Sequence, residues 1–444
     1  MPLRCSVPLD IALGMEYYGL ETPGSGGFLR RELGDFLVFE VSVDGAVASP
    51  RCGDEGGSGE YTWLVMEKRK VDTLTAVRAI EKFFGLPKGS VGVAGLKDTT
   101  AITYQFVSVP LELDPVKVEE FNSKHSRVKL HCFFRRPFRL RPGLLFGNRF
   151  EVVIRDVRNV DAVAEAVQHL KQVGGLPNYY GYQRFGSVRP ITHIVGKHIL
   201  LGEYELAVEK LLLTVYEKES ERAKRVRRYL AETGDYKGTL SMFPRTMHNE
   251  KAVIAYLAEH PGDYVGAFRA LSTYVRKLFI GAYQAYLFNR LLSRRIEEGL
   301  SFVYAVPGDI VGFFSDRKTH EPSGVLLVNS AVVDKVNRWI SEGHAALLLP
   351  IFGYNSQLPS GKPGELAREL LREEGLDLAA FRLKSMPEAS SGGTYRLAAL
   401  KPLEVSYAAE GSTVRLVFTL RKGMYATTLL RDIVKPEDPP AQGF

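Results

Sequence analysis

The sequence of 444 residues is 45% hydrophobic and 25% charged, which is typical of a globular protein long enough for two domains. No uninterrupted apolar run is long enough to cross a bilayer, which argues against a helical membrane protein. The first 20 residues include Asp10 and Glu16 and lack a continuous apolar core, so they do not resemble a signal peptide. The net charge of +7 and the pI of about 9.0 permit nucleic-acid binding without requiring it.

The cysteine pattern indicates neither a zinc site nor a disulfide framework. Cys5, Cys52 and Cys132 lie far apart in the sequence, and no Cys-x-x-Cys spacing occurs. We therefore expect three free thiols with packing roles, in a protein of the reducing cytoplasm.

The first 175 residues predict an alternation of strands and helices. β-branched and aromatic residues indicate strands at 37–43, 61–66, 91–94, 102–109 and 150–154. Asp72 or Thr73 is a suitable N-cap for a helix that ends at Gly85, and a second helix is predicted over 160–173.

From about residue 176 to 390 the pattern is mostly helical. The predicted helices are 206–213, 217–232, 251–259, 264–294 and 365–374, and the predicted short strands are 325–328 and 346–349. After a Gly/Ser cluster, an alternating strand pattern returns at 414–420. The simplest organisation is a strand-rich domain that is interrupted by a helical insertion.

One predicted turn carries a Lys-Asp pair between two strands. In VGVAGLKDTTAITYQ (91–105), Asp98 directly follows Lys97. Alone, this indicates an ordinary turn, because glycine admits unusual backbone angles and aspartate accepts hydrogen bonds from nearby backbone N–H groups. Three other unusual strings change this interpretation: GNRF (147–150), NYYGYQRFG (178–186) and KGMYATTLLRD (422–432).

Together the four strings resemble the TruD family of tRNA pseudouridine synthases, and the resemblance extends from about residue 27 to 435. The long insertion resembles that of the archaeal members. The resemblance implies that Asp98 is the catalytic carboxylate and that the target uracil stacks on Phe150. It also implies that Asn148, Tyr425 and Phe36 line the substrate pocket.

The implied activity is isomerisation of uridine 13 in the D arm of tRNA, so tRNA is the expected partner. The reaction replaces an N-glycosidic bond by a C–C bond to the same ribose, and it requires a flipped uridine, one carboxylate and a dry aromatic pocket. It requires no cofactor and no metal, and we expect neither. The sequence leaves open whether Asp98 adds covalently or removes a proton to give a glycal intermediate.

Several of these residues have structural alternatives. Phe150 could simply be a core residue at a strand start. Lys97 could belong to the substrate site and keep Asp98 ionised by its positive charge, or it could be a solvated turn residue. Glu40 could pair with a pocket cation, although we favour an exposed strand residue. NYYGYQRFG could contact RNA, but we favour a buried hinge.

Two basic regions could bind RNA. Residues 131–155 interleave arginines with phenylalanines, a combination that suits phosphates and unpaired bases. RAKRVRR (222–228) lies on a predicted helix, where a solvated helix face is an equal alternative. The candidate RNA-binding residues are Arg135, Arg136, Arg139, Arg141, Arg149, Arg184, Arg222, Arg225 and Arg228.

The resemblance also implies the fold. We expect an α/β (α+β) protein whose split catalytic domain, residues 1–175 and 393–444, contains a twisted mixed sheet. An inserted, mainly helical TRUD domain would comprise 176–392. Thr99 and Thr100 stand where the family usually has basic residues, which leaves the detailed substrate contacts open.

Two alternatives to the leading function remain. A catalytically inactive RNA-binding or RNA-remodelling protein of the same fold would explain the basic and aromatic residues. A synthase that acts at another RNA site, such as the anticodon loop of a pre-tRNA, would explain all the motifs. The sequence does not separate the latter from the leading function.

Overall fold

The computed structural model describes residues 2–52, 56–97, 101–186, 188–314 and 322–444. The predicted catalytic residue Asp98 and the neighbouring Thr99 and Thr100 lie outside the described residues.

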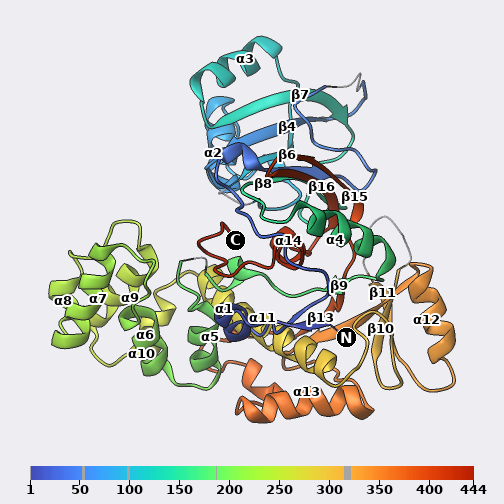
Figure 1. Ribbon diagram of the computed structural model, residues 1–444. Coiled ribbons are helices and arrows are strands. Elements are labelled where there is room, and N and C mark those ends of the chain that lie inside the picture. The colour runs from blue at the N-terminus through green and yellow to red at the C-terminus, as the bar shows by residue number, and fades with distance from the viewer. Residues whose placement is uncertain (1, 53–55, 98–100, 187, 315–321) are drawn as a thin grey trace.

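A mixed eight-stranded sheet forms the upper part of the molecule in Figure 1. Its strand order is β15-β16-β8-β3-β6-β4-β7, with β5 paired to β6. β3 and β6 are parallel and the other neighbours are antiparallel, which confirms the predicted mixed sheet. The strands are β3 (Phe36–Val41), β4 (Tyr61–Arg69), β5 (Gly92–Val93), β6 (Ile102–Val109), β7 (Val128–Arg136), β8 (Gly147–Ile154), β15 (Leu403–Glu410) and β16 (Thr413–Arg421).

Helices pack on this sheet through two apolar clusters. α2 (Thr73–Phe83) and α3 (Pro115–Lys124) share a buried cluster with β4 and β6, and Asp72 caps α2 by accepting a hydrogen bond from the Thr75 amide. α4 (Val160–Gln172) and α14 (Ala426–Val434) belong to a second cluster with β3, β8 and β16. Helices therefore bury the sheet. The sequence predicted two of them, α2 and α4, and did not predict α3 or α14.

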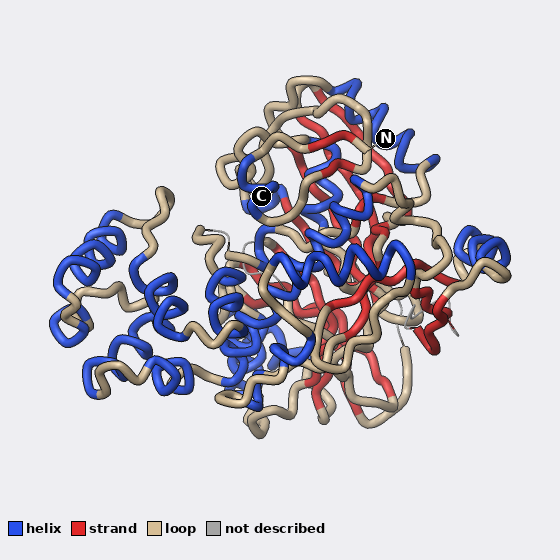
Figure 2. The backbone as a smooth tube through the Cα atoms, turned by 90° about the horizontal axis from the view of Figure 1, so that it is seen from below, coloured by secondary structure: helices blue, strands red, loops and turns tan. Residues whose placement is uncertain are grey.

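The helical region that follows residue 186 is built around a long central helix. Instead of the single helix predicted over 264–294, the structure has α10 (Tyr264–Arg269) and α11 (Thr273–Glu297), because Ser272 caps a new helix by accepting from the Val275 amide. The shorter helices are α5 (Thr192–Leu200), α6 (Tyr204–Leu213), α7 (Glu221–Thr233), α8 (Tyr236–Thr239) and α9 (His248–Glu259). Figures 1 and 2 both show helices of this region as a lobe that projects away from the large sheet.

A second sheet lies on the other side of α11, at the lower right of Figure 1. Its strand order is β11-β10-β12-β13, with all neighbours antiparallel. This region contains β10 (Ile310–Phe314), β11 (Pro322–Leu327), β12 (Ala345–Ile351), β13 (Thr394–Leu397), α12 (Val333–Ser341) and α13 (Gly361–Glu373). The short pair β9 (Leu176–Pro177) and β14 (Ala399–Leu400) connects the two regions of the chain.

The start of the chain packs against α11 and α14 rather than against the large sheet alone. It comprises β1 (Leu3–Arg4), α1 (Pro8–Ala12) and β2 (Tyr17–Tyr18). Asn289 Nδ2 donates to the Leu13 carbonyl at 2.9 Å, and Arg431 Nε donates to Asp10 Oδ2 at 2.5 Å. These buried contacts fix α11 and α14 through one N-terminal segment.

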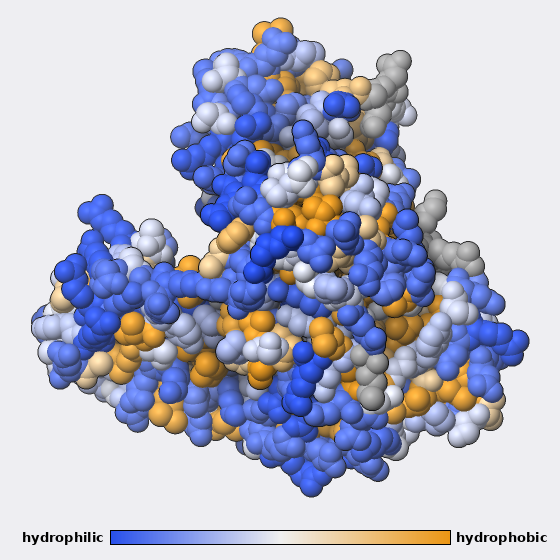
Figure 3. Space-filling model, viewed as in Figure 1, coloured by the Kyte–Doolittle hydropathy of each residue, from blue (hydrophilic) through white to orange (hydrophobic). Residues whose placement is uncertain are grey.

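The cysteine prediction is wrong for two of the three residues. Cys52 and Cys132 form a disulfide across a sequence separation of 80, and Cys5 is free and buried. The reason is tertiary: pairing of β7 with β4 carries Cys132 to the loop that contains Cys52. Among the described residues, no helix is both long and apolar enough to cross a membrane. Hydrophilic residues cover most of the face in Figure 3.

Candidate active site

Five residues that the sequence singled out line one pocket of about 200 Å³. They are Phe36, Lys97, Asn148, Phe150 and Tyr425, which come from β3, the turn after β5, β8 and the start of α14. Arg30, Val38, Leu96, Gln183, Met424, Ala426 and Thr427 complete the lining. Segments that are separated by almost 400 residues therefore meet at a single concave site.

Strand register places the aromatic floor of the pocket. Val38 lies opposite Phe150 in the β3–β8 pair, and Phe418 lies opposite Phe150 in the β16–β8 pair. The Phe150 ring stacks on Phe418 at 5.3 Å between centroids and meets Phe36 edge-on at 6.1 Å. Phe150 is 7% exposed, so it is both a core residue and a pocket residue. The two interpretations that the sequence left open are compatible.

A buried carboxylate fixes the turn that precedes Phe36. Asp35 accepts two hydrogen bonds from Arg155 Nε and one from Arg155 Nη2, at 2.8–3.0 Å, and its other contact is the Glu32 amide. Such a charge-assisted fork is strong and directional. Arg30 lies over the Phe36 ring at 4.2 Å, so a cation also borders the pocket at this turn.

The Lys97 ammonium forms a buried ion pair with Glu40. Its Nζ lies 2.6 Å from Glu40 Oε2, and the two side chains are 5% and 1% exposed. The favoured prediction that Glu40 is exposed is wrong, and the alternative, a partner for a pocket cation, is correct. Lys97 is not a solvated turn residue. Burial raises the pKa of Glu40, and the Lys97 charge opposes that shift.

Asn148 presents an unused acceptor in the pocket. Its Oδ1 is buried and has no hydrogen-bond partner among the described residues. A buried polar atom without a partner costs free energy, and such groups often receive a partner from a bound ligand. Asn148 lies opposite Glu40 in the β3–β8 register, so the amide and the ion pair share one face of the sheet.

An arginine from β13 contacts two tyrosines, Tyr180 and the pocket residue Tyr425. The Arg396 guanidinium lies 4.1 Å from the Tyr180 ring centroid and 5.6 Å from that of Tyr425. It also donates to Gly423 O at 2.6 Å and to Asn178 Oδ1 at 2.8 Å. Burial lowers the pKa of Arg396. The residue before α14, Tyr425, is thus held by a strand of the second sheet.

Sequence reasoning missed Arg30, Arg396 and the pairing of Glu40. Arg30 has only a weak signal, namely that it lies six residues before Phe36 in the sequence. Arg396 has none, because it is a single arginine in a short strand. The burial of Glu40 has only a weak signal, namely that it shares the strand parity of Phe36 and Val38.

NYYGYQRFG is mainly buried, which agrees with the burial expected of it, and its role as a hinge stays a prediction. Tyr179, Tyr182 and Phe185 are at most 4% exposed. The Tyr179 hydroxyl hydrogen-bonds Ser293 Oγ of α11 at 2.8 Å. Arg184 lies 5.9 Å from the Tyr180 ring centroid and does not line the pocket, whereas Gln183 does.

The basic stretch of residues 131–155 has mixed roles. Phe134 is a core residue packed near Trp63, whereas Phe133 and Phe138 are 44% and 48% exposed. The guanidinium groups of Arg135 and Arg139 bond to protein atoms, namely Thr62 Oγ1 for Arg135 and the carbonyls of Gly89 and Val91 for Arg139.

The remaining arginines of this stretch differ in exposure. Arg136 is half-buried over the Phe134 ring, and Arg149 lies 3.8 Å from Glu151 Oε1. Arg141 is exposed. None of the predicted RNA-binding arginines lines the 200 Å³ pocket.

On α7, the predicted basic face is narrower than the sequence indicated. Arg222, Arg225 and Arg228 are exposed. Arg227, which belongs to the same RAKRVRR string, is fully buried, and its Nε donates to Glu219 Oε1 at 2.9 Å. The helical repeat explains the difference, because position 227 lies on the apolar side with Val226 and Leu230.

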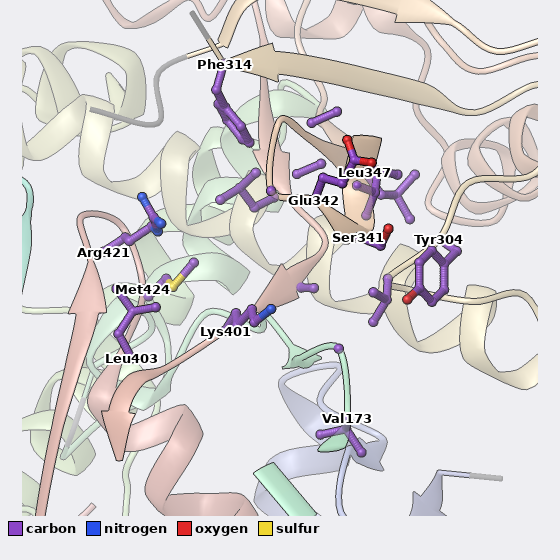
Figure 4. A pocket seen from close by; sticks show the side chains of 18 of the residues that line it. Val173, Tyr304, Phe314, Ser341, Glu342, Leu347, Lys401, Leu403, Arg421 and Met424 are labelled. Atoms are coloured by element: carbon purple, nitrogen blue, oxygen red, sulfur yellow. The ribbon is translucent and has the colours of Figure 1, made fainter. Parts of the chain in front are cut away.

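A larger cavity of about 460 Å³ lies beside the first and shares Met424 with it. It contains none of the predicted site residues. Figure 4 shows its lining, with Arg421, Met424, Leu403 and Lys401 on one side and Ser341, Glu342, Leu347 and Tyr304 on the other. Over the described ranges, no group of three His, Cys, Asp or Glu side chains is placed to hold a metal ion.

Comparison with known proteins gives a consistent result. The sequence matches the family model described as tRNA pseudouridine synthase D (TruD) over residues 12–433. A Methanosarcina mazei protein named probable tRNA pseudouridine synthase D is 35% identical over 438 residues, which cover 96% of this chain and 97% of the relative. A Methanopyrus kandleri protein of the same name is 37% identical over 404 residues, covering 87% and 91%.

The structure is also similar to a solved one. A crystal structure from Methanosarcina mazei, described as a candidate tRNA pseudouridine synthase D, matches with a TM-score of 0.82 at 33% sequence identity. The match covers 98% of this chain and 100% of the other.

Proposed function

The chain belongs to the TruD family of tRNA pseudouridine synthases, and from this premise we propose that it isomerises uridine 13 in the D arm of tRNA to pseudouridine. The observation that carries the proposal is the pocket in which Phe36, Asn148, Phe150 and Tyr425 surround Lys97. Lys97 is the residue that precedes Asp98, the proposed catalytic carboxylate.

The reaction rearranges one nucleotide without net gain or loss of atoms. The C1′–N1 bond of the uridine breaks and a C1′–C5 bond forms, while a hydrogen leaves C5 and N1 gains one. A single carboxylate of Asp98 can act as the nucleophile or as the base. Exclusion of water by the aromatic walls protects the detached base until it has turned.

Phe150 offers the platform on which the flipped uracil would stack. Its ring is fixed by Phe418 and Phe36, so its position is set before substrate arrives. Stacking on an aromatic ring contributes roughly 1–3 kcal/mol per base and would offset part of the flipping cost of a few kcal/mol. The free Oδ1 of Asn148 suits the N3–H donor of uracil.

The division of the chain remains part of the proposal. Residues 1–175 and 393–444 would form the catalytic domain and 176–392 the TRUD insertion, with tRNA held across both in the cytoplasm. Exposed Arg141, Arg222, Arg225 and Arg228 are the best-placed of the candidate arginines for phosphate contacts, because their side chains face solvent.

The test uses an unmodified tRNA transcript that is incubated with wild type or with Asp98→Asn, followed by mapping of pseudouridine at each uridine. We expect product at position 13 with wild type only, and equal tRNA binding by both proteins. Product with Asp98→Asn would refute the assignment of the carboxylate. Product at another site would keep the enzyme and change its target. Binding by wild type without product at any site would favour the inactive RNA-binding alternative.

A further inference from the structure

We propose that Lys68 is a positioning residue for the reaction, and that it acts with Thr73 and Gln105 to hold the turn that carries Asp98. The inference rests on the proposed function, because it assigns Asp98 as the reacting group. None of the three side chains lines the substrate pocket, so their role would be exerted through the backbone of the turn.

Lys68 is a fully buried lysine whose ammonium reaches the turn. Its side chain is on β4 and is 0% exposed. Nζ donates to the carbonyl of Val71 at 3.1 Å and to the carbonyl of Lys97 at 3.2 Å. The Lys97 carbonyl belongs to the peptide bond that joins Lys97 to Asp98. The buried charge therefore contacts the carbonyl of the residue that precedes the proposed catalytic Asp98 in the sequence.

Thr73 and Gln105 hold two more backbone atoms of the same turn. The Lys97 amide donates to Thr73 Oγ1 at 3.1 Å, and this hydroxyl donates to Gln105 Oε1 at 3.1 Å. Gln105 Nε2 donates to the Gly95 carbonyl at 3.3 Å. Thr73 and Gln105 are 1% and 0% exposed, so water does not compete for these bonds.

Three rigid elements supply the three side chains. Strand register sets Lys68 opposite Thr103 and Met66 opposite Gln105, so Lys68 and Gln105 emerge on the same face of the sheet. Thr73 is the first residue of α2, which packs on that face. The turn is thus fixed at the Gly95 carbonyl and at both the amide and the carbonyl of Lys97.

A role in catalysis explains the buried contacts of Lys68 better than a contribution to stability does. A buried ammonium is costly to desolvate, and an apolar side chain of similar size is often at least as stable in its place. A misplacement of about 1 Å of a reacting group can cost about 100-fold in rate. A charge behind the turn also favours the ionised form of a nearby carboxyl.

The decisive experiment is single-turnover formation of pseudouridine at saturating enzyme across a range of pH. The variants are Lys68→Met, Gln105→Leu and, as a matched control, Lys82→Met, which removes an exposed lysine of α2. We expect Lys68→Met to bind tRNA within threefold of wild type and to react about 100-fold more slowly. Lys82→Met should match wild type in both.

The pH profile separates positioning by charge from general structural damage. Arg30 and Lys97, which line the pocket, Glu40, which pairs with Lys97, and Asp72, which caps α2 between Val71 and Thr73, are all unchanged in Lys68→Met. Loss of the Lys68 charge should therefore move the acidic limb of the rate profile to higher pH. Gln105→Leu should lower the rate without moving the limb, because it removes a contact but no charge.

The results that would overturn this inference differ from those that would overturn the proposed function. A Lys68→Met protein with a rate within threefold of wild type and an unmoved limb would overturn this inference alone. Absence of pseudouridine with wild type would overturn the proposed function together with the inference. If Lys68→Met does not fold, as judged by circular dichroism, Gln105→Leu and Thr73→Val decide: normal rates in both would refute positioning through the turn.

Discussion

The ion pair between Glu40 and Lys97 shows how one residue pair ties the strand β3 to the turn before Asp98. Both side chains are at least 95% buried, and the Nζ–Oε2 distance is 2.6 Å. Moving two charges from water into the protein interior costs free energy. Removing one of them leaves the other buried without a counter-charge, which destabilises the fold. The pair therefore links the position of the turn to the folding of the sheet.

We expect Glu40→Leu to lower the free energy of unfolding by about 3–5 kcal/mol, because it leaves the Lys97 ammonium buried without its counter-charge. The double variant Glu40→Leu/Lys97→Met should recover most of that loss, since it removes both charges. Urea unfolding at pH 7.5 measures both changes. A double variant no more stable than Glu40→Leu would contradict the interpretation that the unpaired ammonium is the source of the loss.

At the scale of the residue, the side chains that a motif singled out do converge, and their roles stay a prediction. Phe36, Asn148, Phe150, Tyr425 and Lys97 meet in one pocket, although no single one was identifiable from its type. Partners were less predictable, since Glu40 was expected to face solvent. A side chain's partner depends on which strands become neighbours, and a strand pattern does not specify its neighbours.

At the scale of elements, α5 carries a buried histidine, and the charge of Glu374 only partly opposes the effect of its burial. His193 is 7% exposed, packs against Phe185 and Tyr286, and has no hydrogen-bond partner for Nδ1 among the described residues. Burial lowers the pKa of His193 to about 4, because the protonated imidazole cannot be solvated there.

This shift makes the helix region sensitive to acid. The native pKa lies below that of the unfolded chain, so the stabilisation is complete above about pH 6.5 and is lost as the pH falls towards 4, by up to roughly 3 kcal/mol. His193→Phe should remove this part of the pH dependence of stability. The control is His248→Gln, which replaces an exposed histidine on α9 and should leave the pH dependence unchanged. Urea unfolding at pH 7.5 and pH 4.5 tests the prediction, and equal pH dependence in wild type and His193→Phe would contradict it.

Some periodic elements were predicted closely, whereas one interrupted strand was missed. β6 was predicted with its observed bounds, and α2 was predicted from Asp72 and its apolar stripe. β7 was missed as a strand because it contains a bulge: its register shifts opposite Leu64 and Val65, and Cys132 has a φ of 40°. A bulge breaks the alternation of buried and exposed residues on which sequence prediction relies.

At the scale of the whole molecule, the disulfide between Cys52 and Cys132 closes a loop of the large sheet region. A cross-link over 80 residues restricts the unfolded chain and should stabilise the fold by about 4 kcal/mol. Thiol titration of the unreduced protein in denaturant should give one thiol, from Cys5, and two for Cys52→Ser. Cys52→Ser should also unfold at lower urea concentration. Three thiols in wild type would contradict the bond.

The sequence by itself determined the family, the fold class, many of the regular elements and the residues that converge on the pocket. These follow from local patterns and from motifs, both of which consist of residues that are close together in the sequence. Tertiary structure alone decided the Cys52–Cys132 bond, the Glu40–Lys97 pair, the support of Tyr425 by Arg396 and the contacts of Lys68 with the turn. Each of these joins segments that are far apart in sequence, and their meeting depends on strand order and helix packing rather than on any local periodicity.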